Sequence, residues 1–130
     1  MDGNQVAWIF ELNVNDGHDA ALRTLMTEMV DATRTGEPGT LDYEWYLSED
    51  GRRLHIYERY ADAAATLAHL GNFRERYLTR FFTALTPERM VLYGAPDAAV
   101  RSALAQLAPP VMPQVGGFTR HAPAGKTGTR

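Results

Sequence analysis

Residues 41–60 read LDYEWYLSEDGRRLHIYERY, and this stretch decides the fold. Two runs rich in aromatic and β-branched residues, 41–48 and 53–60, lie on either side of an Asp-Gly pair. Runs of this composition are typical of β-strands. An Asp-Gly pair between two such runs favours a tight hairpin, because both central positions of the preferred turn need a positive φ. The stretch therefore predicts two antiparallel strands joined at Asp50 and Gly51.

A turn centred on Asp50 and Gly51 also predicts which residues of the two strands face each other. The predicted pairs are Leu47 with Leu54, Trp45 with Ile56, Tyr43 with Glu58, and Leu41 with Tyr60. A slip of one residue would turn every side chain to the opposite face of the sheet and break the match of apolar with apolar residues. The pattern therefore favours this register.

The predicted hairpin has two unlike faces. One face carries Leu41, Tyr43, Trp45, Leu47, Leu54, Ile56, Glu58 and Tyr60, and we expect it to pack under helices. The other carries Asp42, Glu44, Tyr46, Ser48, Arg53, His55, Tyr57 and Arg59. Tyrosines and matched charges suit a polar interface better than plain exposure to water. We therefore expect a homodimer formed through this second face, with Glu44, Tyr46, His55, Tyr57 and Arg59 in the interface.

The sequence before the hairpin predicts a strand followed by a helix. Residues 6–13 are rich in strand-forming types, and Asp16 is expected to cap the helix that follows. Apolar residues at spacings of three and four give that helix one buried face. Gly36 is expected to end the helix in the left-handed conformation. Residues 37–39, Glu-Pro-Gly, then predict a turn.

The sequence after the hairpin predicts two short helices, a strand and a further helix. The expected elements are a helix 63–70 capped by Asp62 and stopped by Gly71, a helix capped by Asn72 with an apolar stripe to Leu85, a strand 87–93, and a helix opened by Asp97. The order βαββαβ predicts an α+β fold, ferredoxin-like, with a four-stranded antiparallel sheet and its helices on one face. We expect one domain over residues 1–108 and a Pro/Gly-rich tail over 109–130.

Composition narrows the classes of function. The chain has 130 residues, no cysteine and a formal net charge of −3. These values exclude disulfides and thiol catalysis, and they give no basic footprint for nucleic acid or anionic lipid. No apolar run approaches the roughly 20 residues of a membrane span, and the N-terminus lacks the pattern of a signal peptide. We therefore expect a cytoplasmic protein whose partners are a small molecule and a second copy of the chain.

Two segments resemble the antibiotic biosynthesis monooxygenase family. Residues 37–44, Glu-Pro-Gly-Thr-Leu-Asp-Tyr-Glu, resemble the family's Glu-Pro-Gly turn followed by a Tyr-Glu strand. Residues 57–62, followed by Ala68-His69-Leu70, resemble its second signature, in which a strand ends in an aromatic residue and the next helix carries a histidine. The resemblance implies a dimeric α+β barrel with a ligand cavity between the sheet and the helices of each subunit. It also implies cofactor-independent oxygenation of quinols or polyketide aromatics, or haem degradation.

Glu58 and His69 are the candidate catalytic residues. The register places Glu58 among apolar side chains, where burial would make it more basic and suit it to remove a phenolic proton. The alternative is a structural carboxylate that accepts a hydrogen bond from a tyrosine or a backbone amide. His69 matches the family's helix histidine, which lines the cavity in several members. The alternative for His69 is an exposed or capping residue near a helix C-terminus.

The candidate substrate-binding residues are Tyr43, Trp45, Tyr60, Phe73 and Asn13. The four aromatic residues suit a wall for a flat ligand, although aromatic stripes are also ordinary core. Asn13 loosely matches a pocket asparagine of the oxygenase members, and it also suits an ordinary strand end. Haem-degrading relatives carry a tryptophan where this chain has Tyr60, so the resemblance favours haem degradation less.

The resemblance, together with these candidate residues, implies a monooxygenase, without a bound cofactor or metal, that acts on a small aromatic quinol or phenol. The four histidines show no metal-ligand spacing, and the chain has no glycine loop that would cradle a phosphate. A non-catalytic dimeric domain that binds an aromatic ligand is the alternative, because such folds serve many purposes. An open cavity with Glu58 and His69 both facing it would favour the enzyme.

Overall fold

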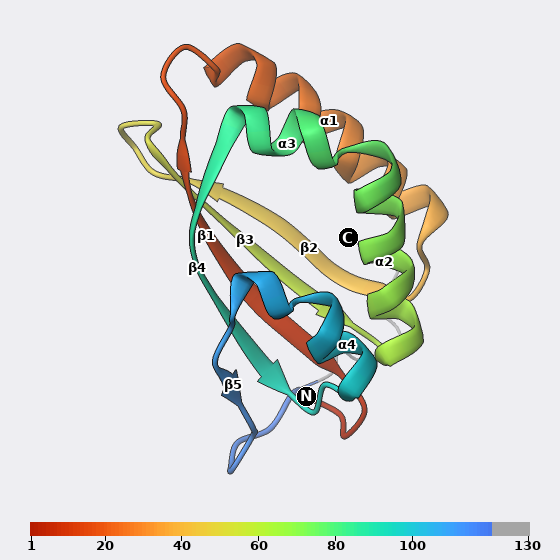
Figure 1. Cartoon of the computed structure of the whole chain (residues 1–130). Helices are drawn as coiled ribbons and strands as arrows, with labels where there is room; N and C mark the ends of the chain where they lie inside the picture. The colour runs from red at the N-terminus through yellow and green to blue at the C-terminus, as the bar shows by residue number, and fades with distance from the viewer. Residues whose placement is uncertain (121–130) are drawn as a thin grey trace.

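A five-stranded sheet with helices on one face forms the body of the protein (Figure 1). The structure is a computed structural model, and it describes residues 1–120. The strands are β1 (Val6–Val14), β2 (Thr40–Leu47), β3 (Arg53–Tyr60), β4 (Leu85–Gly94) and β5 (Val111–Met112). Their order across the sheet is β2-β3-β1-β4-β5. The first four strands pair antiparallel, and β5 pairs parallel to β4. The predicted α+β class is confirmed, with one strand more than predicted.

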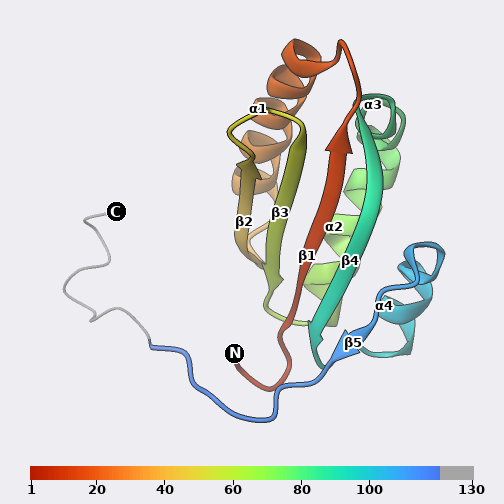
Figure 2. The ribbon, with the colours of Figure 1, turned by 90° about the vertical axis from the view of Figure 1, so that its left-hand side faces the viewer.

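Three of the helices lie on the same face of the sheet. The helices are α1 (Asp19–Gly36), α2 (Ala63–Arg76), α3 (Leu78–Ala84) and α4 (Ala98–Ala103), and a 3-10 turn, Ala105–Leu107, follows α4. Turning the molecule by 90° shows α1, α2 and α3 behind the sheet and α4 at one end of it (Figure 2). Within residues 1–120 the opposite face of the sheet carries no helix (Figure 2).

The hairpin of β2 and β3 has the predicted register over most of its length. The confirmed pairs are Leu47 with Leu54, Trp45 with Ile56, and Tyr43 with Glu58. The register shifts at the start of β2, so Thr40 pairs with Tyr60 and Leu41 is the extra residue of a bulge. The predicted pairing of Leu41 with Tyr60 is therefore wrong. At the turn Gly51 has a φ of 74°, whereas Asp50 keeps a negative φ, so the predicted turn type is also wrong.

The helix after the hairpin differs from the prediction. Asp62 caps it as expected, because its side chain accepts a hydrogen bond from the backbone N–H of Ala65 at 2.8 Å. The helix then continues through Gly71 and Asn72 to Arg76. A glycine inside a helix costs roughly 1 kcal/mol, which tertiary packing readily outweighs. The predicted break at Gly71 and the predicted cap at Asn72 are therefore wrong.

Two smaller predictions also fail. Helix α1 begins at Asp19, with His18 rather than Asp16 at its cap position, and Gly36 does not have a positive φ. Within the predicted tail, Val111 and Met112 form β5 against β4. The part of the tail from residue 121 to 130 lies outside the described residues.

Strand β4 contains an irregularity near its start. Leu12 of β1 pairs with Pro87, and the next residue along, Glu11, pairs with Arg89, so Glu88 has no partner on β1. Proline cannot donate to the sheet and is tolerated at such bulges. On its other side β4 pairs with β5 only at Leu92 and Tyr93.

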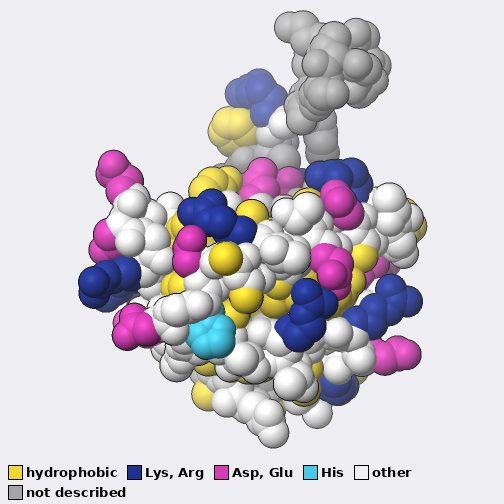
Figure 3. Space-filling model, turned by 90° about the horizontal axis from the view of Figure 1, so that it is seen from above, with side chains coloured by type: hydrophobic (Ala, Val, Ile, Leu, Met, Phe, Trp, Pro, Cys, Tyr) yellow, Lys and Arg dark blue, Asp and Glu magenta, His cyan; other side chains and the backbone are white. Residues whose placement is uncertain are grey.

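The core lies between the helices and the inner face of the sheet, which we define as the face that α1, α2 and α3 cover. Its fully buried side chains include Trp8, Leu12, Leu25, Ile56 and Phe81. Seen from above, the surface carries Lys and Arg interspersed with Asp and Glu (Figure 3). Among residues 1–120, no helix combines the length and apolarity needed to cross a membrane.

Candidate functional site

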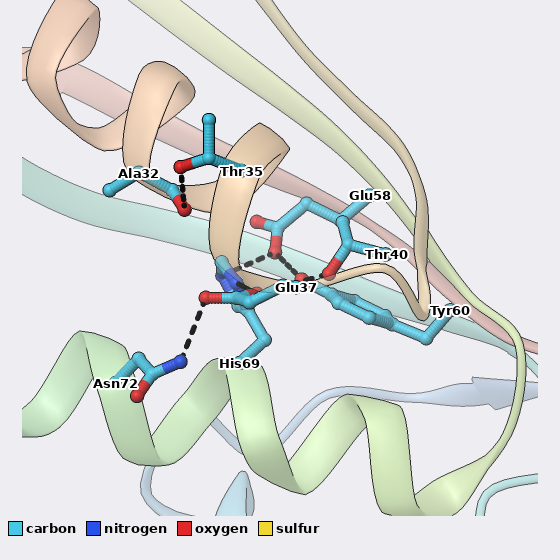
Figure 4. Close-up of polar contacts among 8 residues, drawn as sticks. All are labelled: Ala32, Thr35, Glu37, Thr40, Glu58, Tyr60, His69 and Asn72. Atoms are coloured by element: carbon cyan, nitrogen blue, oxygen red, sulfur yellow. Dashed lines mark hydrogen bonds and ion pairs between the residues drawn. The ribbon is translucent and has the colours of Figure 1, made fainter.

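A polar network is buried between β3 and α2 (Figure 4). Glu58 on β3 and His69 on α2 are each only 5 % exposed. The hydroxyl of Tyr60 donates to Glu58 Oε1, and His69 Nε2 lies 3.3 Å from the same oxygen. The second oxygen of Glu58 makes no hydrogen bond or ion pair with the other residues drawn (Figure 4). One carboxylate oxygen is therefore held by two groups, while the other has no partner in the network.

A second carboxylate completes the network. His69 Nδ1 donates to Glu37 Oε1 at 2.7 Å, so the imidazole bridges two carboxylates. Glu37 also accepts hydrogen bonds from Thr40 Oγ1 at 3.0 Å and from Asn72 Nδ2 at 3.1 Å. Buried charges are tolerated when each one is paired and hydrogen-bonded in this way.

The Glu-Pro-Gly turn brings Glu37 to the network. Glu37 directly follows α1, and the turn then leads into β2. At Gly39 a Cβ atom would lie 2.5 Å from the Cβ of Ala65, so only glycine lets the turn lie this close to α2. The close approach places the Glu37 side chain beside His69 and Asn72, which lie on the same helix.

Helix α2 presents His69 to the inner face of the sheet. Thr66, His69 and Phe73 follow at spacings of three and four, so their side chains share one face of the helix. Thr66 is fully buried, and Phe73 packs against the core. Since the helix continues past Gly71, His69 lies inside the helix and not at its C-terminal cap. The alternative of an exposed or capping histidine is thereby overturned.

The carboxylates control the charge of His69. Burial lowers the pKa of His69, but hydrogen bonds and attraction from Glu37 and Glu58 outweigh it and raise the pKa from 6.5 to about 9. Burial raises the pKa of Glu37, but the contacts with His69, Asn72 and Thr40 lower it by more. The pKa of Glu37 is therefore lowered overall. At neutral pH His69 is therefore an imidazolium ion that donates from both ring nitrogens.

Two tyrosines next to Glu58 remain protonated. Burial, together with the charge of Glu58, raises the pKa of Tyr43 and that of Tyr60 well above 10. Tyr60 is fully buried, and its hydroxyl is a fixed donor to Glu58. Tyr43 packs edge-on against the His69 ring, with 5.2 Å between the ring centroids.

A small cavity lies beside the network, between the sheet and α2, α3 and the turn after α4. It offers about 60 Å³ in which the centre of a water molecule can move, enough for a few waters. Its lining residues are Trp8, Phe10, Met29, Tyr43, Ile56, Glu58, His69, Leu70, Phe73, Phe81, Phe82, Met90, Leu104 and Leu107. Glu58 and His69 are the charged members of this otherwise mainly apolar wall. Phe82 is its most exposed member, at 36 %.

The cavity brings together four of the seven predicted site residues. Glu58, His69, Tyr43 and Phe73 line it. Tyr60 does not line the cavity but holds Glu58, and Trp45 packs behind the wall against Phe81. Asn13 lies elsewhere, where its side chain donates to Glu88 Oε2 at 2.8 Å near the surface. Asn13 therefore does not line this cavity, and its role in substrate binding stays a prediction.

Glu37, Asn72 and Trp8 were not predicted as site residues. Glu37 was part of the quoted Glu-Pro-Gly motif, but the motif predicted only a turn. Asn72 was expected to cap a helix that does not begin there. Trp8 lies directly across from Glu58 on the neighbouring strand β1, a pairing that the hairpin register alone does not predict. Among residues 1–120, no group of three His, Asp or Glu side chains is placed to hold a metal ion.

The antiparallel strands β1 to β4, in ferredoxin-like order with helices over one face, define a small α+β domain. Residues 6–80 match the model of the family described as antibiotic biosynthesis monooxygenase. The chain belongs to the antibiotic biosynthesis monooxygenase family. No curated protein matches the chain.

Several solved structures are similar to this chain. MupZ from Pseudomonas fluorescens has a TM-score of 0.78 at 24 % identity, over 90 % of this chain and 95 % of MupZ. Rv0793 from Mycobacterium tuberculosis has a TM-score of 0.54 at 28 % identity, over 73 % and 98 %. SnoaB from Streptomyces nogalater, a cofactor-independent oxygenase, has a TM-score of 0.60 at 16 % identity, over 73 % and 96 %. At 24 % and 16 % identity, MupZ and SnoaB support the fold alone.

Proposed function

We propose that the protein is a cofactor-independent monooxygenase that acts on a small phenol or quinol in the cavity. The observation that carries this proposal is the Glu58–His69–Glu37 network, which borders an otherwise mainly apolar cavity. Buried acid and base groups at the wall of an apolar pocket are a frequent feature of catalytic sites. Membership of the antibiotic biosynthesis monooxygenase family and the fold shared with SnoaB agree with this function.

The network divides the chemical roles between its members. Glu58 is the proposed general base, because one of its oxygens has no partner in the network (Figure 4). It accepts the phenolic proton, and the substrate becomes an electron-rich anion. His69 is already protonated at neutral pH, so it serves as the cation that stabilises this anion and not as the base. This assignment narrows the expectation from the sequence, in which either residue was a candidate base.

The anion then reacts with oxygen without an external reductant. In a phenol or quinol that also carries a CH2 group conjugated with the ring, this group loses both hydrogens and becomes a carbonyl. One atom of O2 enters that carbonyl, and the other leaves as water together with the two hydrogens. The substrate supplies all the electrons, and the protein supplies the base, the cation and an apolar environment that excludes water.

Oxygen uptake with a panel of phenols and quinols tests the proposal. Replacing Glu58 with Gln keeps the shape but removes the base, and we expect kcat/KM to fall by about 10²- to 10⁴-fold. Glu11→Gln is the matched control, because Glu11 lies on the opposite face of the sheet near His55, and we expect its activity to be unchanged. Equal activity of wild type and Glu58→Gln would remove Glu58 from the mechanism.

The small size of the cavity favours a second candidate function. A drug-sized ligand occupies several hundred Å³, so only a small molecule enters unless side chains such as Phe82 move. A non-catalytic domain that binds a small apolar ligand fits this volume. Binding of a phenol without oxygen uptake or product would support this candidate, and turnover would exclude it.

A further inference from the structure

We propose that Glu37 is a positioning residue of the site, a permanent counter-ion that holds the His69 cation against Glu58. In this arrangement Glu58 exchanges a proton with the ligand, whereas Glu37 stays ionised throughout. The inference rests on the proposed function, and it adds a group that acts on the reaction only through His69.

The first observation is that the two carboxylates hold the histidine ring unequally. Glu37 Oε1 lies 2.7 Å from His69 Nδ1, within the range of a charge-assisted N–H···O bond. Glu58 Oε1 lies 3.3 Å from His69 Nε2, beyond the usual length of such a bond. The same oxygen of Glu58 also accepts from the Tyr60 hydroxyl, so two donors share it. The ring is therefore held mainly by Glu37.

The second observation is that both oxygens of Glu37 are occupied. Oε1 accepts from Thr40 Oγ1 at 3.0 Å as well as from His69, and Oε2 accepts from Asn72 Nδ2 at 3.1 Å. Glu37 does not line the cavity, whereas Glu58 does. Glu58 also keeps one oxygen without a partner in the network (Figure 4). Glu58 is therefore placed to take a proton, and Glu37 is placed to remain charged.

The fold fixes the carboxylate of Glu37 in this place. Asn72 lies three residues after His69 on α2, so both donors leave the same side of the helix. The turn that carries Glu37 packs closely on α2, because a Cβ atom at Gly39 would collide with that helix. Thr40, the first residue of β2, adds the third donor. Moving the carboxylate away from the ring would break all three hydrogen bonds.

The titratable groups in contact with the His69 ring come from three parts of the chain. Glu37 comes from the turn after α1, Glu58 and Tyr60 from β3, and Tyr43 from β2. Burial and the charge of Glu58 hold the pKa of each tyrosine well above 10, so both tyrosines stay neutral. The negative charge at the ring is therefore supplied by the two carboxylates.

The separate roles of the carboxylates follow from the proton transfer itself. When the O–H bond of the phenol breaks and Glu58 takes the proton, Glu58 loses its charge. Glu37 is still ionised, so the imidazolium persists and stabilises the new phenolate. Without Glu37, the transfer would leave His69 buried with no carboxylate counter-ion, and burial favours the neutral ring.

The charge of His69 provides the first test, and it needs no turnover. In the NMR spectrum the ring is assigned by Overhauser contacts with Tyr43 and Tyr60, whose ring centroids lie 5.2 and 5.3 Å away. In wild type we expect the pKa of about 9 that burial and the two carboxylates give His69. In Glu37→Gln we expect the ring to titrate about 1–3 pH units lower. An unchanged titration would overturn the inference.

The matched control for this titration is Glu11→Gln. It also removes a carboxylate beside a histidine, but on the opposite face of the sheet. We expect it to leave the titration of His69 where it is in wild type. A titration of His69 that moves equally in Glu11→Gln and Glu37→Gln would reflect the net charge of the chain, and it would overturn the specific role of Glu37.

The pH dependence of oxygen uptake provides the second test, with a phenol that wild type oxidises. If Glu37 acts through the charge of His69, Glu37→Gln should lower kcat/KM roughly 2- to 100-fold at pH 8. At pH 6, where the ring regains its proton, the loss should be less than about 3-fold. Equal losses at both pH values would mean that Glu37 supports only the fold, and they would overturn the inference.

A second variant covers the case in which Glu37→Gln does not fold. Glu37→Asp keeps the charge but draws the carboxylate away from Nδ1, so His69 should titrate lower than in wild type. An unchanged titration in this variant would then overturn the inference. If wild type oxidises no phenol, the proposed function fails, and the titration of His69 still decides whether Glu37 holds the charge of the ring.

Discussion

The two faces of the sheet each pair a carboxylate with a cation, but in different surroundings. On the inner face Glu58 contacts His69, and both side chains are about 6 % exposed. On the outer face, which no helix of residues 1–120 covers, Asp42 forms an ion pair with Arg59, and their side chains are 30 % and 24 % exposed. The outer face also has a histidine next to a carboxylate. His55 lies 3.9 Å from Glu11 and is about half exposed, unlike the buried His69.

The difference in exposure determines how strongly each ion pair affects stability. Water screens the pairs on the outer face, and exposed pairs contribute about 0–1 kcal/mol. Burial on the inner face removes that screening, so loss of one partner leaves an uncompensated charge. The inner pair therefore sets the protonation of His69, while the outer pairs stay screened by water.

Replacing one histidine on each face should give the largest difference in the free energy of unfolding. Replacing His69 with Gln leaves Glu37 and Glu58 buried without a cation, and we expect the free energy of unfolding to fall by about 3–5 kcal/mol. Replacing His55 with Gln should change it by less than about 1 kcal/mol. Urea unfolding at pH 7 measures both. Similar losses for the two variants would mean that burial does not distinguish the faces.

The pH dependence of stability should follow the inner pair. The folded protein raises the pKa of His69 from 6.5 to about 9, so it holds this proton more tightly than the unfolded chain does. The resulting stabilisation is fully present below pH 6.5 and disappears as the pH rises through about 9, a loss of about 3 kcal/mol. Unfolding measured between pH 6 and 10 should show this slope in wild type and in His55→Gln. A slope that persists in His69→Gln would assign it to another group.

A substitution on the outer face should have a smaller effect, and this effect should be on the association of two chains. We propose that this face pairs with a second copy of the chain, since Tyr46 is 57 % exposed there beside Glu44 and His55. Light scattering at micromolar concentration should give the mass of a dimer. Tyr46→Glu places a second negative charge beside Glu44 and should weaken the dimer by about 10-fold or more. Arg23→Glu on the exposed side of α1 is the control, and a monomeric wild type would contradict the proposal.

The smallest effect should come from Asn13. Its side chain contacts Glu88 near the surface, away from the cavity. Asn13→Ala should therefore leave oxygen uptake unchanged and alter the free energy of unfolding by less than about 0.5 kcal/mol. A large loss of activity in this variant would place Asn13 in the site after all.

Local patterns were sufficient to predict much of the fold. The register of the hairpin follows from the alternation of apolar residues between 41 and 60, because one face is buried and a slip would expose it. Asp62 was predicted correctly as a helix cap, since that interaction involves residues only three apart. Gly71 misled the prediction, because the packing of Thr66, His69 and Phe73 outweighs the local cost of one glycine.

The sequence identified only those site residues that the hairpin register or the family resemblance indicates. Glu58 and His69 were identified, the first from its place on the apolar face and the second from the resemblance. Their partner Glu37 is 32 residues from His69 along the chain, and no local pattern predicts that contact.

The irregular start of β4 has a consequence for how chains meet one another. A free sheet edge is a template for pairing with strands of other molecules, and it is the usual starting point of aggregation. Here Pro87 offers no N–H, the bulge at Glu88 interrupts the ladder, and β5 covers the edge at Leu92 and Tyr93. This edge is therefore a poor template for strand addition. The proposed dimer through the outer face would need no strand addition at this edge.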